Sequence, residues 1–316
     1  MQVMRIPQHT IWTIALMIVS IASPVTFLDA STTVSGHRIL FVAPHPDDES
    51  LGTAGEIFNA QKQAGRGIDY RVVIMTCGDA YKAAFQRWVE LGLARDLNGD
   101  GKIDFLDFGI TRRNETMSAL SLLGVPAEKI IFLGYPDGGL DKMSGDKPFE
   151  SPFTKTSEVP YSFAYHKGAP YSDESAVADL TRIILEFDPQ TVYSTTPTDE
   201  NPDHAITREF VDRALKRAGG TRTHLEYLVH WERHEPTWPG TTPNWTRPIG
   251  HIPADIIVPL STFNIDPTLK PLVIASYTTQ VAVESKYLLG FAKDTENFWK
   301  SRGPRSDYLT PHPEEK

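Results

Sequence analysis

This 316-residue chain has a single cysteine and no excess of positive charge, and each shortage excludes a class of protein. The one cysteine, Cys77, cannot form an internal disulfide, so the fold is not a disulfide-stapled scaffold. With 31 Lys and Arg against 40 Asp and Glu, the net charge is −9, and the chain has no basic stripe for binding phosphates. Nucleic acid is therefore not an expected partner. No internal repeat is present that would indicate a repeat architecture.

The rest of the composition is typical of a soluble globular enzyme. With 40% hydrophobic and 22% charged residues, a chain of this length can bury one large core. No shift in composition marks a second independent domain. We therefore expect a single domain over residues 37–300, followed by a disordered tail over 301–316.

The first thirty residues differ in kind from the rest. Arg5 and His9 precede an apolar run over residues 11–22, and Leu28-Asp29-Ala30 resembles a cleavage site with small residues. This pattern predicts a signal peptide over residues 1–30, or alternatively an uncleaved anchor, although the apolar core is short for a membrane span. We expect a secreted or extracytoplasmic protein that contacts membranes only through this segment, if it is retained.

Alternating strand and helix patterns predict an α/β protein with a Rossmann-like, three-layer α/β/α fold and a mostly parallel sheet. Helices are predicted from Gly52 onward, over residues 117–123, and from the cap at Ser172 to the stop at Asp188-Pro189. A further helix is predicted to hold Ile206 and Phe210 on one face and to end at Gly219-Gly220. The segment 142–171 has no period and is expected to be a lid or binding loop. The strands are predicted over residues 39–43, 70–76, 129–133, 190–194 and 227–230.

The first predicted strand ends in an unusual cluster of polar residues, His45, Asp47, Asp48 and Glu49. Ligands bind at the carboxyl ends of strands in open α/β sheets, and three adjacent carboxylates need a cation to offset their repulsion. Imidazole and carboxylate suit a divalent ion such as zinc. Alternatively, Asp47 or Asp48 simply caps the next helix, but capping explains only one carboxylate.

A second polar cluster follows the strand at 190–194 and contains Asn201 and His204. If the two strands are neighbours, both clusters meet at the same sheet edge, and His204 can reach a cation held by His45 and Asp48. Three protein ligands would leave the fourth position free for water, as catalytic zinc sites require. Taken alone, His204 could equally be a surface residue near a helix start.

These stretches, together with two others, resemble the PIG-L/LmbE-type zinc-dependent de-N-acetylases, roughly from residue 38 to 280. The resemblance implies that His45, Asp48 and His204 bind zinc and that Asp47 is the general base. The stretches that carry it are Pro44-His45-Pro46-Asp47-Asp48-Glu49, Arg112-Arg113-Asn114-Glu115, Leu133-Gly134-Tyr135-Pro136-Asp137-Gly138 and Pro202-Asp203-His204.

The resemblance further implies an arginine beside the substrate, which is Arg112 or its neighbour Arg113. Alternatively, Arg112 forms only a structural salt bridge with Glu115. Asn201 departs from the family, since many relatives have a histidine there. Asn201 could donate a hydrogen bond to an oxyanion but cannot be a general acid, so His230 or Asp47 would have to supply the proton.

A third feature lies outside the family pattern and resembles the calcium loop of EF-hands, most closely the dockerin version. Oxygen ligands recur at alternate positions and glycine occupies position 6, which allows the sharp turn. Such clusters are also found in ordinary solvated turns. We expect a structural Ca²⁺ bound as an insertion at residues 96–107, with the backbone carbonyl of Lys102 as one ligand. The remaining ligands would be the side chains of Asp96, Asn98, Asp100, Asp104 and Asp107.

Together, these features predict an exported, zinc-dependent hydrolase that removes an N-acetyl group from an N-acetylglucosamine-type sugar or glycoconjugate. The region 231–245 contributes three tryptophans, which suit either a sugar ring or plain packing. The alternative is a metal- and carbohydrate-binding protein with little or no turnover, for which Asn201 is the chief argument. A third class, a two-metal phosphoesterase, would need further His/Asp clusters at strand ends, and the sequence does not offer them.

Overall fold

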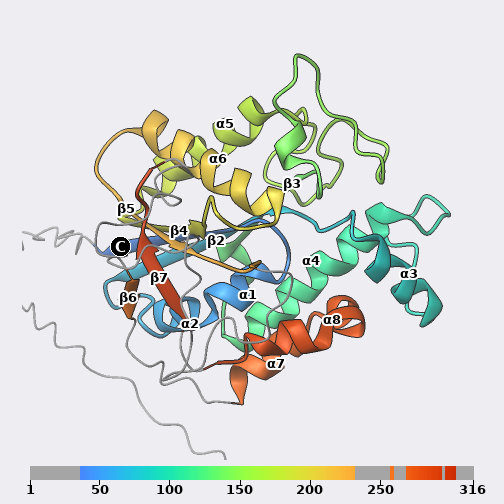
Figure 1. Cartoon of the computed structure of the whole chain (residues 1–316), viewed down its shortest axis with the longest axis horizontal. Coiled ribbons are helices and arrows are strands. Elements are labelled where there is room, and N and C mark those ends of the chain that lie inside the picture. Colours follow the sequence, from blue (N-terminus) through green and yellow to red (C-terminus); the bar gives the residue numbers. More distant parts are fainter. Residues whose placement is uncertain (1–35, 232–256, 260–267, 294–295, 304–316) are drawn as a thin grey trace, which may run out of the picture. The chain divides into compact units, whose positions relative to one another are not determined.

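A computed structural model of the chain describes residues 36–231, 257–259, 268–293 and 296–303 (Figure 1). These residues all belong to one compact unit, Ser35–Lys316. The predicted signal peptide or anchor, Trp238, Trp245 and residues 304–316 of the predicted tail lie outside the described residues. Within the described ranges, every helix is too short or too polar to cross a bilayer.

The sheet has five parallel strands at one side and two antiparallel strands at the other. β7 pairs antiparallel with β5, and β6 pairs antiparallel with β7. This arrangement confirms the predicted α/β class with a mostly parallel sheet. In spatial order the strands are β3 (Ile130–Tyr135), β2 (Ile68–Thr76), β1 (His37–Ala43), β4 (Thr191–Thr195), β5 (Thr223–Tyr227), β7 (Asn297–Lys300) and β6 (Ile257–Pro259).

Helices cover both faces of this sheet, which gives the three layers expected (Figure 1). Successive side chains of β1 point to opposite faces, so Phe41 packs in one core and Leu40 and Val42 pack in the other. The Leu40 face is covered by α5 (Asp173–Phe187) and α6 (Pro202–Ala218). The Phe41 face is covered by α2 (Ala54–Lys62), α4 (Phe105–Leu122), α7 (Leu269–Ala275) and α8 (Thr278–Gly290).

Local sequence accounts for where the central helices begin and end. The Ser172 hydroxyl accepts the backbone N–H of Ser175 and caps α5, and Asp188 ends the helix in the left-handed conformation before Pro189. Asn201 caps α6, with Pro202 in the first turn, and Gly219 ends it at φ 66°. The cap at Ser172 and the ends of both helices agree with the prediction, whereas α4 begins at Phe105, well before the predicted 117–123.

Strand β5 corrects one sequence prediction. The apolar run suggested a strand over 227–230, whereas the strand is Thr223–Tyr227 and pairs with β4. The backbone N–H groups of Val229 and His230 donate to the Asp199 carboxylate. The apolar residues after Tyr227 therefore form a buried loop that binds the Asp199 carboxylate. The elements that the sequence did not predict are α1 (Asp48–Gly52), α3 (Lys82–Glu90), α7, α8, β6, β7 and two short 3₁₀ helices, Ala127–Lys129 and Leu140–Lys142.

Candidate active site

The two polar clusters meet at one edge of the sheet because their strands are neighbours. β1 pairs in parallel with β4, so both strands deliver their following loops to the same side. The loop after β1 leads into the short helix α1, which begins at Asp48. The loop after β4 leads into α6, which carries His204 in its first turn. The predicted convergence of the two clusters is confirmed.

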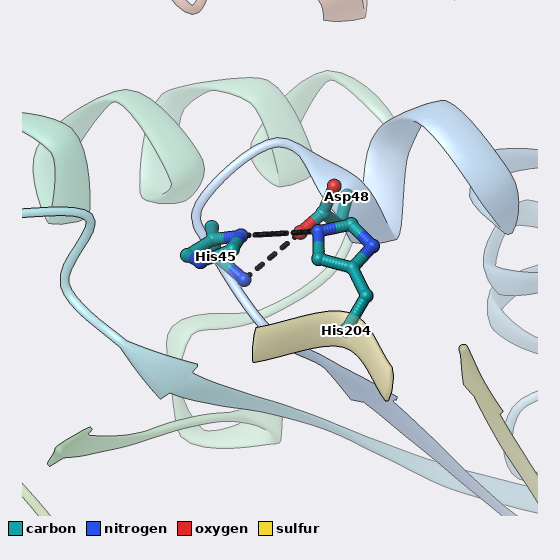
Figure 2. Close-up of side chains that lie close together, drawn as sticks. All are labelled: His45, Asp48 and His204. Atoms are coloured by element: carbon teal, nitrogen blue, oxygen red, sulfur yellow. Dashed lines mark hydrogen bonds and ion pairs between the residues drawn. The ribbon is translucent and has the colours of Figure 1, made fainter. Parts of the chain in front are cut away.

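Three buried side chains converge here, His45, Asp48 and His204 (Figure 2). Asp48 Oδ2 lies 3.0 Å from His45 Nδ1 and 3.0 Å from His204 Nε2. The two ring nitrogens are themselves 3.2 Å apart. The backbone N–H of His45 also donates to Asp48 Oδ2, at 3.0 Å, which fixes the carboxylate within its turn.

This geometry fits a small tetrahedral cation. Zinc held by bonds of about 2.0–2.1 Å separates its ligand atoms by about 3.3 Å, close to the spacings of these three atoms. Two nitrogens and one carboxylate oxygen are also a donor set that catalytic zinc sites use. His45, Asp48 and His204 could therefore hold a zinc ion and leave one coordination position open.

Carboxylates on the far side of each imidazole support this triad. Asp199 Oδ2 lies 3.1 Å from His204 Nδ1. Both Asp137 Oδ1 and Asp203 Oδ2 lie 3.3 Å from His45 Nε2. Metal-binding histidines usually bond a carboxylate through their other nitrogen, which fixes the ring and its tautomer. The sequence analysis assigned no role to these three aspartates.

The carboxylates also make this a site for positive charge. Burial alone would lower the pKa of His204, but the charges of Asp199 and Asp48 raise it to about 9. Burial likewise opposes protonation of His45, yet Asp137, Asp203 and Asp48 raise its pKa well above the usual range. The site therefore stabilises cations at the position where the ring nitrogens meet.

Asp47 stands next to the triad in an unusual backbone conformation, with φ 122° and ψ −35°. Its carbonyl accepts the N–H groups of Ser50 and Leu51, and its own N–H donates to Glu49 Oε2. Such strain in a non-glycine residue is concentrated at functional sites. Here it directs a buried carboxylate into the pocket beside Asp48.

Arg112 holds the Asp47 carboxylate, and this distinguishes it from Arg113. The Nη2 group of Arg112 donates to Asp47 Oδ2 at 3.0 Å and to the Pro46 carbonyl at 2.6 Å. Its Nη1 donates to the Gly78 carbonyl. Arg113 instead lies outside the pocket, against the rings of Phe132 and Phe163. The structure therefore places Arg112, and not Arg113, in the site.

Arg112 does not form the alternative salt bridge with Glu115, because its guanidinium pairs with Asp47. Glu115 accepts hydrogen bonds from the hydroxyls of Thr278 and Thr279 and from the Thr279 backbone. These bonds tie α4 to the start of α8. The role of Glu115 is to join two helices behind the pocket.

Asn201 and His230 both line the pocket. The side-chain oxygen of Asn201 accepts the N–H of Asp203 and is occupied in capping α6. His230 Nδ1 lies 3.0 Å from the Tyr287 hydroxyl. Burial is the main cause that lowers the pKa of His230 to about 4, and the charge of His204 lowers it further. His230 is therefore neutral near pH 7.

The pocket has a volume of about 370 Å³. One wall carries His45, Asp47 and Asp48. Helix α8 contributes a second wall with residues that no sequence pattern singled out, since α8 itself was not predicted. These residues are Gln280, Glu284, Tyr287 and Leu288.

The predicted calcium loop lies at the start of α4. Asp104 caps the helix and forms a reciprocal capping box with Asp107. Both oxygens of Asp96 accept backbone N–H groups of the loop, from Gly99 and Gly101. Among the described residues, the acidic groups of this loop do not gather into a cluster of the kind formed by His45, Asp48 and His204.

Residues 40–215 match the model of the PIG-L family, described as GlcNAc-PI de-N-acetylase. The 1D-myo-inositol 2-acetamido-2-deoxy-alpha-D-glucopyranoside deacetylase of Mycobacterium sp. (strain KMS) is 31% identical over 186 residues, which are 57% of this chain and 51% of that protein. The protein of the same name from Gordonia bronchialis is 30% identical over 193 residues, 58% of this chain and 59% of its own. The chain spans about half the length of the curated relatives it matches.

Solved structures of similar proteins include two deacetylases. The zinc inhibited form of teicoplanin deacetylase Orf2 superposes with a TM-score of 0.52 at 20% identity, over 83% of this chain and 97% of that one. The A40926 pseudoaglycone deacetylase Dbv21 gives a TM-score of 0.51 at 19% identity, over 83% and 96%. At this level of identity, the likeness shows a common fold.

Proposed function

Because this chain belongs to the PIG-L family, we propose that it is a hydrolase that removes the acetyl group from an N-acetylglucosamine-type amino sugar or glycoconjugate. One observation carries the proposal: the buried triad of His45, Asp48 and His204 lies beside Asp47, at a pocket that His45, Asp47 and Asp48 line. A metal site with an adjacent carboxylate is what metal-assisted amide hydrolysis requires.

We propose zinc as the resident ion, held by His45, Asp48 and His204. When bound, zinc would lower the pKa of water and polarise the amide carbonyl. The supports are the ligand spacing, the nitrogen and oxygen donors, and the carboxylates behind each ring. Ferrous iron suits the same donors, so metal analysis of the purified protein must separate the two.

Asp47 is the proposed general base. Its carboxylate lines the pocket within two residues of the proposed ligands, and Arg112 holds one of its oxygens. Asp47 can take a proton from the attacking water and return it to the leaving amine, so one residue performs both transfers. This removes the need for a histidine at Asn201 and leaves neutral His230 to contact the substrate.

The substrate class follows from the relatives. The curated relatives are named as deacetylases of an acetamido-glucopyranoside linked to myo-inositol, and the family model names GlcNAc-PI. Both names share an N-acetylglucosamine unit, and a pocket of about 370 Å³ has room for a sugar. We therefore propose a glycoside of N-acetylglucosamine as substrate.

The test is acetate and free-amine release from N-acetylglucosamine and its glycosides by zinc-loaded protein. Asp47→Asn keeps the shape of the side chain and should lower kcat by about 10²–10⁴-fold. The matched control is Asp141→Asn, at an exposed position, which should retain full activity. Equal activity in the Asp47 variant, or no release by the zinc-loaded wild type on any acetylated sugar, would contradict the proposal.

We also propose that the protein is exported through its first thirty residues. The support is the apolar segment that follows Arg5 and precedes Leu28-Asp29-Ala30. Expression of the full chain, followed by mass spectrometry of the N-terminus in the extracytoplasmic fraction, tests this. Retention of all the protein in the cytoplasm with Met1 in place would contradict it.

A structural calcium ion in the 96–107 loop is a further proposal, supported by the spacing of its oxygen-bearing residues. Calcium should raise the melting temperature of the wild type. Asp100→Ala should abolish that rise and leave the zinc content unchanged, because the loop is separate from the triad. Equal melting temperatures in calcium and in a calcium-selective chelator would contradict the proposal.

A further inference from the structure

The wall of the pocket formed by α8 has a chemistry of its own. Gln280, Glu284, Tyr287 and Leu288 line the pocket, and their spacing places them on one face of the helix. This face begins at residue 280, beyond the residues 40–215 that match the family model. The wall is therefore a feature of this chain that the family match does not describe.

The backbone of Glu284 departs from helical geometry. Its φ of −127° and ψ of 35° are not helical and mark a kink within α8. Kinks of this sort have specific causes and are frequent at functional sites. The side chain reaches the hydroxyl of Tyr81, at the start of α3, which donates to Glu284 Oε1. Among the described residues, no group donates to the other oxygen, Oε2.

The surroundings of Glu284 combine polar and apolar surfaces. Phe153, from the long 142–171 loop, and Leu288 also line the pocket. Phe153 is held by an edge contact with Phe105, whose ring centroid is 5.1 Å away. Sugars and cyclitols present hydroxyls on their edges and C–H groups on their faces. A carboxylate acceptor in the same pocket as an aromatic ring and an aliphatic side chain complements both.

From this arrangement we propose a second subsite, formed by Glu284, Tyr81, Phe153 and Leu288. It binds the hydroxyl-rich ring attached to the N-acetylglucosamine unit. The free oxygen of Glu284 accepts a hydroxyl of that ring, Tyr81 fixes the carboxylate, and Phe153 and Leu288 pack on the ring's C–H groups. This inference rests on the proposed deacetylase function and specifies which substrates that function prefers.

The test compares a monosaccharide with glycosides that carry a second ring. Kinetic constants are measured for N-acetylglucosamine, for an N-acetylglucosamine disaccharide and for N-acetylglucosaminyl-inositol. Glu284→Gln should raise KM for at least one two-ring substrate by about five- to tenfold and change its kcat little, because a charged hydrogen bond to the remote ring is lost. Constants for the monosaccharide should stay the same.

Two further variants complete the design. Tyr81→Phe should give a smaller rise in KM for the same two-ring substrate, since Glu284 remains but is less well fixed. Glu209→Gln makes the same chemical change on the exposed side of α6 and should alter nothing. Isothermal titration of the two-ring substrate into Asp47→Asn protein, with and without Glu284→Gln, gives a binding constant independent of turnover.

The two proposals fail in different ways. If the wild type releases no acetate from any substrate, the proposed function is wrong. If it deacetylates all three substrates, and Glu284→Gln leaves KM and binding of both two-ring substrates unchanged, the second subsite is wrong. A rise in KM that is equal for the monosaccharide would also overturn it, because Glu284 would then act on the acetamido ring itself.

Discussion

Asp199 is the single residue on which the orientation of His204 depends most. Its Oδ2 lies 3.1 Å from His204 Nδ1 and also accepts the backbone N–H groups of Val229 and His230. One buried carboxylate thus holds a proposed ligand and the loop after β5 at once. Asn201 joins the same network, since its N–H donates to Asp199 Oδ1.

We therefore predict that Asp199→Asn weakens zinc binding by about 10–100-fold, the usual cost of losing a carboxylate behind a metal-binding histidine. Competition with a chromophoric chelator measures the change. Asp141→Asn serves as the surface control. Unchanged zinc affinity, with the fold intact by circular dichroism, would show that Asp199 is structural only.

Gly78 gives a second prediction at this scale. A Cβ added here would lie 1.9 Å from Arg112 Nη1, so Gly78→Ala must displace the guanidinium that holds Asp47. We expect kcat/KM to fall by at least about tenfold, from the loss of a charged hydrogen bond.

Gly65→Ala is the control variant for the backbone strain that any alanine at a positive φ introduces. Both glycines have positive φ, 63° and 74°, but a Cβ at Gly65 meets nothing within 4 Å. The positive φ alone should therefore cost each variant about 1–2 kcal/mol of stability, and only Gly78→Ala, which also displaces Arg112, should impair activity. Equal activity losses in the two variants would attribute the effect to strain alone.

The residues proposed to bind a metal could be singled out because each follows a strand end in the sequence. His45 and Asp48 stand directly after an apolar strand, and neighbouring parallel strands bring His204 to them. Asp137 and Asp199 act through contacts that only the folded chain creates. Asp199 lies five residues before His204, but this spacing does not predict a contact between the Asp199 carboxylate and Nδ1 of His204.

At the scale of elements, α4 connects the predicted calcium loop to the pocket. Asp107 lies in its first turn, is fully buried, and accepts three backbone N–H groups, from Leu97, Asn98 and Asp104. Arg112 lies farther along the same helix. The loop is thus fastened to α4 by hydrogen bonds of its own, independent of any ion.

Asp107→Ala should accordingly lower the free energy of unfolding by about 2–4 kcal/mol even in chelator, because several buried N–H groups lose their acceptor. Asp104→Ala removes one helix cap and should cost about 1 kcal/mol. Urea titrations in EDTA measure both. Equal costs, or no loss without calcium, would mean that Asp107 acts chiefly as a metal ligand.

The central elements were predictable and the C-terminal ones were not, for a physical reason. β1, β2, β3 and β4 are buried on both faces and read as continuous apolar runs. The face of α8 that lines the pocket is largely polar, with Gln280 and Glu284, so it gives no apolar stripe of the kind that predicts a helix from sequence. The pocket wall that carries the proposed second subsite was therefore hidden in the sequence.

At the scale of the whole molecule, the chain couples its stability to pH through His224. This residue of β5 donates from Nε2 to Ser194, because the Ser194 hydroxyl itself donates to the Thr195 carbonyl. Its Nδ1 is buried and has no hydrogen-bond partner in the described part of the chain. Burial lowers the pKa of His224 to about 4. The charge of Glu226 opposes this shift, and the charge of Arg208 adds to it.

The sign of the effect follows from proton uptake. The unfolded chain binds a proton at His224 with a pKa of about 6.5, whereas the folded chain does so only near pH 4. Between these values, unfolding takes up a proton, so stability falls as the pH falls. At pH 5 the loss relative to pH 7.5 is about 2 kcal/mol from this residue.

We predict that His224→Asn, which keeps a side chain able to bond Ser194, reduces this loss. Urea unfolding at pH 7.5 and pH 5 should show the wild type losing about 1–2 kcal/mol more than the variant. If wild type and His224→Asn lost equal stability, His224 would have to be protonated in the fold, and its Nδ1 would then need an acceptor that β5 and its described neighbours do not supply.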